Sequence, residues 1–191
     1  MKKKLFSLLL LTLFLGFAVS AQKNNGTDRF GKALNLGVGI GGNTGYSSYV
    51  GHSLPIFNVN YEFDVARNFT LAPFISFYSY KNSYYWGNNN NPYRYYYYHE
   101  TVIPVGVKGT YYFDNLLRAG SKWDFYMAGS IGFAFVNSSW DNDYYGDQNY
   151  YHSASSLFLD LHVGTEYHFN NRIGAFLDLS TGFSTIGLAI H

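Results

Sequence analysis

Residues 93–113, YRYYYYHETVIPVGVKGTYYF, decide the fold of this chain. The stretch begins as a run of tyrosines and then alternates apolar residues with small or polar ones. One set of side chains contains Ile103, Val105 and Val107, and the other contains Gly106 and Lys108. Alternation with a period of two predicts a β-strand whose two faces lie in different surroundings. The rest of the chain indicates what those surroundings are.

The composition is unusual for a protein that exposes its surface to water. Aromatic residues make up 21% of the 191 residues, while charged residues make up only 13%, against roughly 25% in ordinary globular domains. Basic and acidic residues nearly balance, so nothing predicts a nucleic-acid partner. Cysteine is absent, which excludes disulfides and a lipid-modified cysteine.

The first 21 residues predict a cleaved secretory signal peptide. Lys2, Lys3 and Lys4 precede an apolar segment, and Val19-Ser20-Ala21 supplies small residues for cleavage. The apolar segment is shorter than the roughly 20 residues of a transmembrane helix. We therefore expect an exported chain with a short N-terminal segment at 22–33 and one domain at 34–191, and an uncleaved anchor is the alternative.

The period-two alternation returns in seven further segments. With the opening stretch this makes eight predicted strands. Single-chain bacterial outer-membrane barrels have an even number of strands, so this count is consistent with such a barrel. Connections alternate between long and short until the last pair, which predicts short turns and both termini on the periplasmic side. The seven further segments lie near 34–41, 55–63, 69–78, 123–135, 157–169, 173–182 and 186–190.

The second face of these strands favours a membrane barrel over a soluble one. It consists mainly of Gly, Ala, Ser, Thr and Asn, whereas soluble surfaces are roughly 25–35% charged. The apolar face also becomes aromatic at one end, as expected for a girdle at the headgroup boundary. Lipid permits no unpaired sheet edge, so the sheet must close. The expected inner girdle contains Tyr61, Phe63, Phe69, Tyr111, Phe113, Trp123, Phe125, Tyr167 and Phe169.

We therefore predict an all-β fold: an eight-stranded antiparallel up-and-down transmembrane β-barrel in the outer membrane of a Gram-negative cell. A soluble, secreted eight-stranded barrel is the alternative. The chain resembles the small outer-membrane β-barrel proteins of Bacteroidetes-type bacteria, through "LNLGVGIGG", "TVIPVGVKGTYYF", "WDFYMAGSIGFAF" and "TIGLAI". The resemblance implies assembly by the outer-membrane insertion machinery, which typically recognises a final aromatic residue, whereas this chain ends Ile190-His191.

The inward face carries ionisable residues that we expect to form a polar network filling the lumen. An eight-stranded barrel is just wide enough for side chains to fill it, and unpaired buried charge is costly. A proton or small-ion path is the less favoured interpretation. The predicted network contains Glu62, Glu100, Lys108, Asp160, His162, Glu166 and Asp178.

Nothing in the sequence predicts a catalytic residue, a metal site or a cofactor. His162, Glu166 and His168 share one strand face and are candidate metal ligands, but His162 and His168 lie roughly 20 Å apart along it, too far to share an ion. Residues 141–149, DNDYYGDQN, only partly match a calcium loop because position twelve is His152. Residues 152–156, HSASS, place a histidine near serines without an assignable acid. We therefore expect a protein that is not an enzyme.

Two long connections are rich in tyrosine, tryptophan, asparagine and glycine, a composition also found in adaptable recognition surfaces. They span residues 81–98 and 137–155. The competing interpretation is that they are strand extensions and outer-girdle residues. The possible surface-recognition residues are Trp86, Tyr93, Arg94, Trp140, Tyr144 and Tyr145.

The predicted function is therefore structural or surface-interacting, carried by long extracellular loops. A narrow channel or carrier of small hydrophobic molecules is the first alternative, and a lipid-modifying barrel enzyme is the second. The expected partners are outer-membrane lipid, lipopolysaccharide, the insertion machinery during assembly and an unidentified surface ligand, with the barrel monomeric. Pro104 lacks a backbone donor, which predicts a bulge or distorted pairing there.

Overall fold

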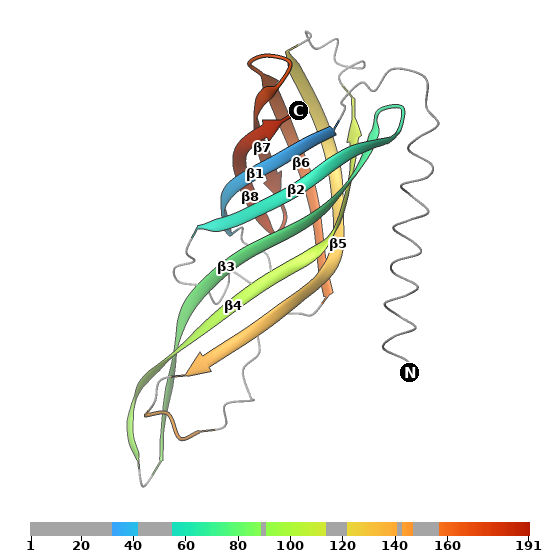
Figure 1. The fold of residues 1–191 in the computed structure, drawn as a ribbon. Helices are drawn as coiled ribbons and strands as arrows, with labels where there is room; N and C mark the ends of the chain where they lie inside the picture. Colours follow the sequence, from blue (N-terminus) through green and yellow to red (C-terminus); the bar gives the residue numbers. More distant parts are fainter. Residues whose placement is uncertain (1–31, 42–54, 89–90, 114–121, 141–142, 147–156) are drawn as a thin grey trace, which may run out of the picture.

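The computed structural model describes residues 32–41, 55–88, 91–113, 122–140, 143–146 and 157–191. Within these residues the fold is a closed barrel in which each strand pairs with its neighbours in sequence and β8 returns to β1 (Figure 1). All eight pairings are antiparallel. The strands are β1 (Lys32–Gly41), β2 (Ile56–Ala66), β3 (Phe69–Asn88), β4 (Asn91–Tyr112), β5 (Trp123–Trp140), β6 (Leu157–His168), β7 (Ile173–Ser180) and β8 (Phe183–Ile190).

The described part of the chain contains no helix of the length and apolarity needed to cross a membrane.

Closure of the barrel confirms the predicted architecture. The first and last strands pair continuously, from Leu34 opposite Ile190 to Gly41 opposite Phe183. A closed sheet leaves no free row of backbone donors and acceptors, which is the condition for β-structure in hydrocarbon. The barrel begins at Lys32, two residues before the predicted start of the domain.

The outer surface is apolar, which identifies the fold as a transmembrane β-barrel. Leu161 is 68% exposed and Ile131 is 60% exposed, while their inward neighbours Asp160 and Ser130 are buried. Exposed apolar patches of this extent are unfavourable in water and are covered by lipid in a membrane barrel. The outward apolar residues include Leu34, Leu36, Val38, Phe57, Val59, Ile75, Phe77, Met127, Phe133, Phe135, Leu159, Val163, Leu177, Leu179, Ile186 and Leu188.

The predicted inner girdle lies at the barrel end where the first strand begins and the last one finishes. The aromatic rings contact one another there: Trp123 lies 4.8 Å from Tyr167, and Tyr167 lies 5.5 Å from Phe169, between ring centroids. The strands at this end are joined by a short β2–β3 turn in which Asn68 has a φ of 65°, a left-handed conformation that asparagine tolerates. This end is called the girdle end below.

The connection predicted at 81–98 is mostly a pair of strands, as in the alternative interpretation of strand extensions. β3 has 20 residues and β4 has 22, and they pair as far as Asn88 opposite Asn91, so the connection predicted at 81–98 is mostly a two-stranded ribbon. Tyrosine and tryptophan favour strands, and facing aromatic pairs such as Tyr85 and Tyr95 stabilise them. Figure 1 shows β3 and β4 extending well past the shorter strands β1, β7 and β8.

Pro104 interrupts one ladder without a bulge. Its pairing with Ala134 on β5 is in register. On the β3 side the partners run to Ile75 opposite Val105 and resume at Tyr78 opposite Val102 in the same register. The predicted bulge is therefore wrong, and the predicted disturbance of pairing is confined to one side, where proline offers no donor.

Some predictions fall outside the described residues. These are the signal peptide at 1–21, the N-terminal segment apart from Lys32 and Ala33, and the HSASS stretch at 152–156. Residues 143–146 are the described part of the calcium-like stretch.

Candidate functional site

The barrel interior holds the residues of the predicted lumen network. Glu62, Glu100, Asp160, Glu166 and Asp178 are buried, and the side chains of Lys108 and His162 are 12% and 8% exposed. These positions follow from strand alternation, because each faces opposite to its apolar neighbours. The structure arranges the set in clusters at different levels of the barrel, and His162 Nε2 of the central cluster also lies 3.6 Å from Asp160 Oδ2.

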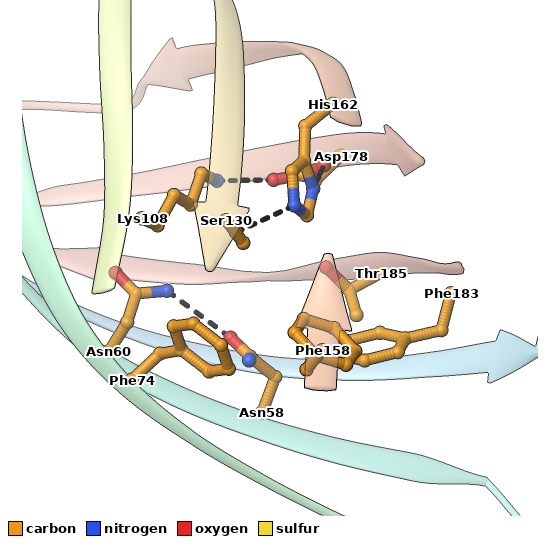
Figure 2. A pocket seen from close by; sticks show the side chains of 10 residues that line it. All are labelled: Asn58, Asn60, Phe74, Lys108, Ser130, Phe158, His162, Asp178, Phe183 and Thr185. Atoms are coloured by element: carbon orange, nitrogen blue, oxygen red, sulfur yellow. Dashed lines mark hydrogen bonds and ion pairs between the residues drawn. The ribbon is translucent and has the colours of Figure 1, made fainter. Parts of the chain in front are cut away.

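The central cluster joins four strands around Asp178. Lys108 of β4 forms an ion pair with Asp178 Oδ2, and Tyr126 Oη donates to the same oxygen at 3.2 Å. His162 Nδ1 lies 2.8 Å from Asp178 Oδ1, and its Nε2 lies 2.9 Å from Ser130 Oγ (Figure 2). The carboxylate is therefore paired and hydrogen-bonded on both oxygens, as a buried charge requires.

Ser130, His162 and Asp178 are aligned in the order found in serine hydrolases. This arrangement could not be predicted from the sequence, because the three residues come from three strands and form no local motif. The cavity beside them has a volume of about 20 Å³, which is room for a single water molecule. Aromatic rings from Phe74, Phe158 and Phe183 border it (Figure 2).

A second cluster surrounds Glu62 near the girdle end. Tyr112 Oη donates to Glu62 Oε1 at 2.6 Å, and the Thr70 hydroxyl donates to the same oxygen. Asn35 Nδ2 donates to Glu62 Oε2 at 3.1 Å and to Asn60 Oδ1 at 2.9 Å. These bonds connect β1, β2, β3 and β4, so the cluster ties the first half of the barrel together.

Asp160 stabilises the β7–β8 turn at the opposite end. Its Oδ1 accepts from Thr181 Oγ1 and from the Gly182 backbone N–H, both at 2.7 Å, and its Oδ2 accepts from Ser180 Oγ at 2.8 Å. Three donors from one turn explain how a buried carboxylate is tolerated there. These hydrogen bonds stabilise a short β7–β8 turn. The turn lies at the same end of the barrel as the long β1–β2 and β5–β6 connections.

An apolar layer inside the barrel was missed by sequence reasoning. Ile56, Phe74, Phe158 and Phe183 form a buried cluster, with Tyr78 packed against it. All occupy inward positions of their strands, so the strand phase could have identified them. The lumen is consequently filled by apolar rings as well as by polar groups.

A third polar cluster lies at the girdle end and combines β5, β6 and the residue after β8. His168 Nε2 lies 2.7 Å from Asp124 Oδ2, and His191 Nε2 lies 2.7 Å from Glu166 Oε1. His162 belongs to the central cluster instead. The predicted separation of His162 from His168 is therefore seen in the structure, but His191 provides a different neighbour for His168.

The predicted recognition residues converge at the tip of the β3–β4 ribbon. Tyr144 is buried between Trp140, Trp86 and Tyr96, with ring centroids at 4.1, 5.2 and 5.3 Å. Trp140 and Tyr144 are stacked at an interplanar angle of 14°. These four rings, called the aromatic stack below, link the ribbon to the end of β5.

The charged and exposed members of the predicted set surround this stack. Arg94 Nη2 lies 3.0 Å from Asp143 Oδ2, and its guanidinium lies over the Tyr96 ring. Hydrogen bonding to Tyr96, and then to Asp143, raises the pKa of Arg94 above its ordinary value, so the group is charged at every physiological pH. Tyr93 and Tyr145 are 65% and 73% exposed.

No protein-family model matches the chain, and no curated protein sequence matches it. The resemblance to the Bacteroidetes-type family therefore stays a prediction.

Comparison with solved structures finds other small membrane barrels. A de novo designed transmembrane β-barrel is 9% identical, with a TM-score of 0.47 over 83% of this chain and 92% of that chain. The crystal structure of Ail, the attachment invasion locus protein of Yersinia pestis, is 9% identical, with a TM-score of 0.42 over 83% and 95%. Ail in a phospholipid bilayer nanodisc is 12% identical, with a TM-score of 0.37 over 84% and 98%.

Proposed function

We propose that this transmembrane barrel lies in the outer membrane and acts as a surface-interaction protein whose recognition surface is the β3–β4 ribbon. The observation that carries the proposal is the length of these strands. β4 has 22 residues, which span roughly 75 Å, whereas crossing a bilayer takes about 9–11 residues. Half of the β3–β4 hairpin therefore lies outside the hydrocarbon.

The aromatic stack supports the ribbon near its tip. An isolated two-stranded hairpin is marginally stable in water, and packing of Tyr144 against Trp86 and Tyr96 supplies a third layer. A rigid surface loses little conformational entropy on binding. The stack therefore supports a preformed binding surface rather than a flexible loop.

The outward side of the ribbon exposes a row of aromatic rings. Tyr85, Tyr93 and Tyr95 are 55%, 65% and 63% exposed, and Tyr85 contacts both of the others. Lys81 lies over the Tyr97 ring at the base of the row. Exposed aromatic patches are common in interaction surfaces.

The proposed orientation follows from the two ends of the barrel. The ribbon lies at the end opposite the girdle end, where β1 begins and β8 finishes. Long extensions face outward in bacterial barrels, so the ribbon would be extracellular and both termini periplasmic. Lipid and lipopolysaccharide would surround a monomeric barrel, and the outer-membrane insertion machinery would assemble it.

We further propose that the protein is not an enzyme. Lys108 pairs with Asp178, which weakens the support that this carboxylate gives His162 as a base. The adjoining cavity of about 20 Å³ admits one water but no acyl substrate. The Ser130–His162–Asp178 alignment then serves to satisfy buried groups.

The same filled lumen argues against a channel. Side chains from all levels occupy the interior, from Glu62 at the girdle end to Phe183 at the other. We expect negligible conductance in planar bilayers, and stable channels would favour the transport alternative.

The surface-interaction proposal is tested by removing the exposed row without shortening the strands. The variant Tyr85→Thr/Tyr93→Thr/Tyr95→Thr keeps β-branched residues, and Tyr61→Thr/Tyr111→Thr removes outward tyrosines at the girdle end as a matched control. Cells displaying each barrel are measured for saturable adhesion to a panel of immobilised glycans and glycoproteins. We expect adhesion by the wild type and control, and its loss in the triple variant. Wild-type adhesion no greater than that of cells lacking the barrel would contradict the proposal.

A further inference from the structure

We propose that the girdle end of the lumen contains a binding site for a zinc-class divalent cation, formed by Glu166, His168 and His191. One donor atom from each of the three side chains lies within 4.8 Å of the other two. Two imidazoles and one carboxylate form a known set of protein ligands for zinc, which leaves a fourth position open to water. This site is independent of the ribbon and of its proposed function.

The pairing of β6 with β7 and of β7 with β8 brings the three ligands together. Glu166 and His168 are alternate residues on the inward face of β6, and His168 pairs with Gly174 of β7. Gly174 in turn pairs with Ala189 of β8, and His191 follows two residues later. The backbone N–H of His191 donates to Arg172 O at 2.9 Å, so the residue is held against the start of β7.

Gly174 provides the space that the site needs. It lies between β6 and β8 with its missing side chain directed into the lumen, and a Cβ at this position would collide with Glu166 Oε1. A side chain at this position would require the Glu166 carboxylate, at the end of a flexible side chain, to shift. A glycine at this position therefore lets side chains from non-adjacent strands meet across β7.

Asp124 hydrogen-bonds the side of the His168 ring that faces away from the other two ligands, as carboxylates commonly do for metal-binding histidines. His168 Nε2 lies 2.7 Å from Asp124 Oδ2, while its Nδ1 lies 3.7 Å from Glu166 Oε1. A proton held on Nε2 by the carboxylate leaves the Nδ1 lone pair facing the other ligands, as in carboxylate–histidine–metal arrangements. This hydrogen bond indicates an oriented ligand independently of the clustering itself.

The geometry requires only a small closure around an ion. Ligands at 2.0–2.1 Å from a tetrahedral zinc ion lie roughly 3.3 Å from one another. His191 Nε2 and Glu166 Oε1 are already 2.7 Å apart, and the rings of His168 and His191 lie with centroids 5.0 Å apart. The His191–Glu166 pair would open slightly, and the more distant donor atoms, which lie within 4.8 Å of one another, would close in around the ion.

The site is accessible and its charges suit a dication. The side chains of His168 and His191 are 21% and 16% exposed, at the open end of the barrel. Glu166 and Asp124, when ionised, supply two negative charges close to the ligand atoms. Neutralising both with one divalent ion would favour binding where water is limited.

The test is a calorimetric titration of zinc chloride into the full chain, folded in zwitterionic detergent after treatment with a chelator. We expect one zinc ion per barrel. His191→Ala and His168→Gln should abolish saturable binding, and Asp124→Asn should weaken it about 10- to 100-fold. His99→Gln, a change at an exposed histidine of β4, is the matched control and should bind as the wild type does.

Folding of each variant is checked by heat-modifiable migration in gels. His191 follows the last strand, so His191→Ala should fold. Its zinc titration therefore tests the proposal even if His168→Gln fails to fold. Absence of saturable zinc binding by the wild type, or wild-type affinity in His191→Ala, would overturn the proposal.

Discussion

Ser130 Oγ lies 2.9 Å from His162 Nε2 in the barrel lumen. This contact has the geometry of a nucleophile and its base, but the neighbouring cavity admits only water. We therefore expect no covalent labelling of Ser130 when the folded barrel is incubated with a fluorophosphonate probe. Mass spectrometry of the treated protein checks this, with Ser130→Ala as the control. Phosphonylation of Ser130 would contradict the proposal that the protein is not an enzyme.

Lys108 and Asp178 should be strongly coupled in stability. Lys108→Met leaves Asp178 as a buried carboxylate without its ion-pair partner, which costs about 3–5 kcal/mol. The double variant Lys108→Met/Asp178→Asn removes both charges and should recover much of that loss, because replaced buried pairs are often nearly neutral. Urea unfolding in detergent of the wild type, Lys108→Met, Asp178→Asn and the double variant provides the comparison. Additive losses in the double variant would mean that the two groups do not depend on each other.

The outer surface of β6 should not tolerate charge. Leu161 is 68% exposed in the middle of that strand, so Leu161→Arg places a cation in hydrocarbon at a cost of about 2–4 kcal/mol. Tyr145→Arg, at a position 73% exposed beside the ribbon, should change the free energy of unfolding by less than about 0.5 kcal/mol. Equal effects of the two changes in lipid vesicles would contradict the assignment of the apolar belt to lipid.

The aromatic stack should control the stability of the ribbon alone. Tyr144→Ala removes three ring contacts worth about 2 kcal/mol together, so amide exchange in residues 83–88 and 91–98 should become roughly 30-fold faster. Exchange in β6–β8 should not change. Tyr145→Ala, which alters an exposed neighbour, is the control. Unchanged exchange in the ribbon would show that Tyr144 does not stabilise it.

Strand alternation was enough to predict the faces of the barrel. Because the side-chain period in a strand is two, Leu159, Leu161 and Val163 had to lie opposite Asp160 and His162, and the structure places them so. The same alternation places Phe74 and Phe158 on the inward face, where they form part of the buried cluster. Their apolar character made this inward position less apparent from the sequence.

The arrangement of the clusters could not be predicted in the same way. His191 meets Glu166 because β8 pairs with β7 and β7 pairs with β6 in this register, and Ser130, His162 and Asp178 come from three strands. Such contacts depend on the register between strands, which single-strand patterns do not encode. The ribbon was predicted as a loop because its asparagines and glycine suggested turns, while its tyrosines pair across two strands.

Surface labelling of single cysteines tests the central claim most directly, because the chain has no cysteine of its own. Tyr93→Cys lies on the exposed ribbon and Phe169→Cys lies at the girdle end. With a membrane-impermeant maleimide on intact cells, we expect Tyr93→Cys to be labelled, and Phe169→Cys to be labelled only after the outer membrane is permeabilised. Labelling of Phe169→Cys but not Tyr93→Cys in intact cells would contradict an outer-membrane barrel that presents the ribbon outside.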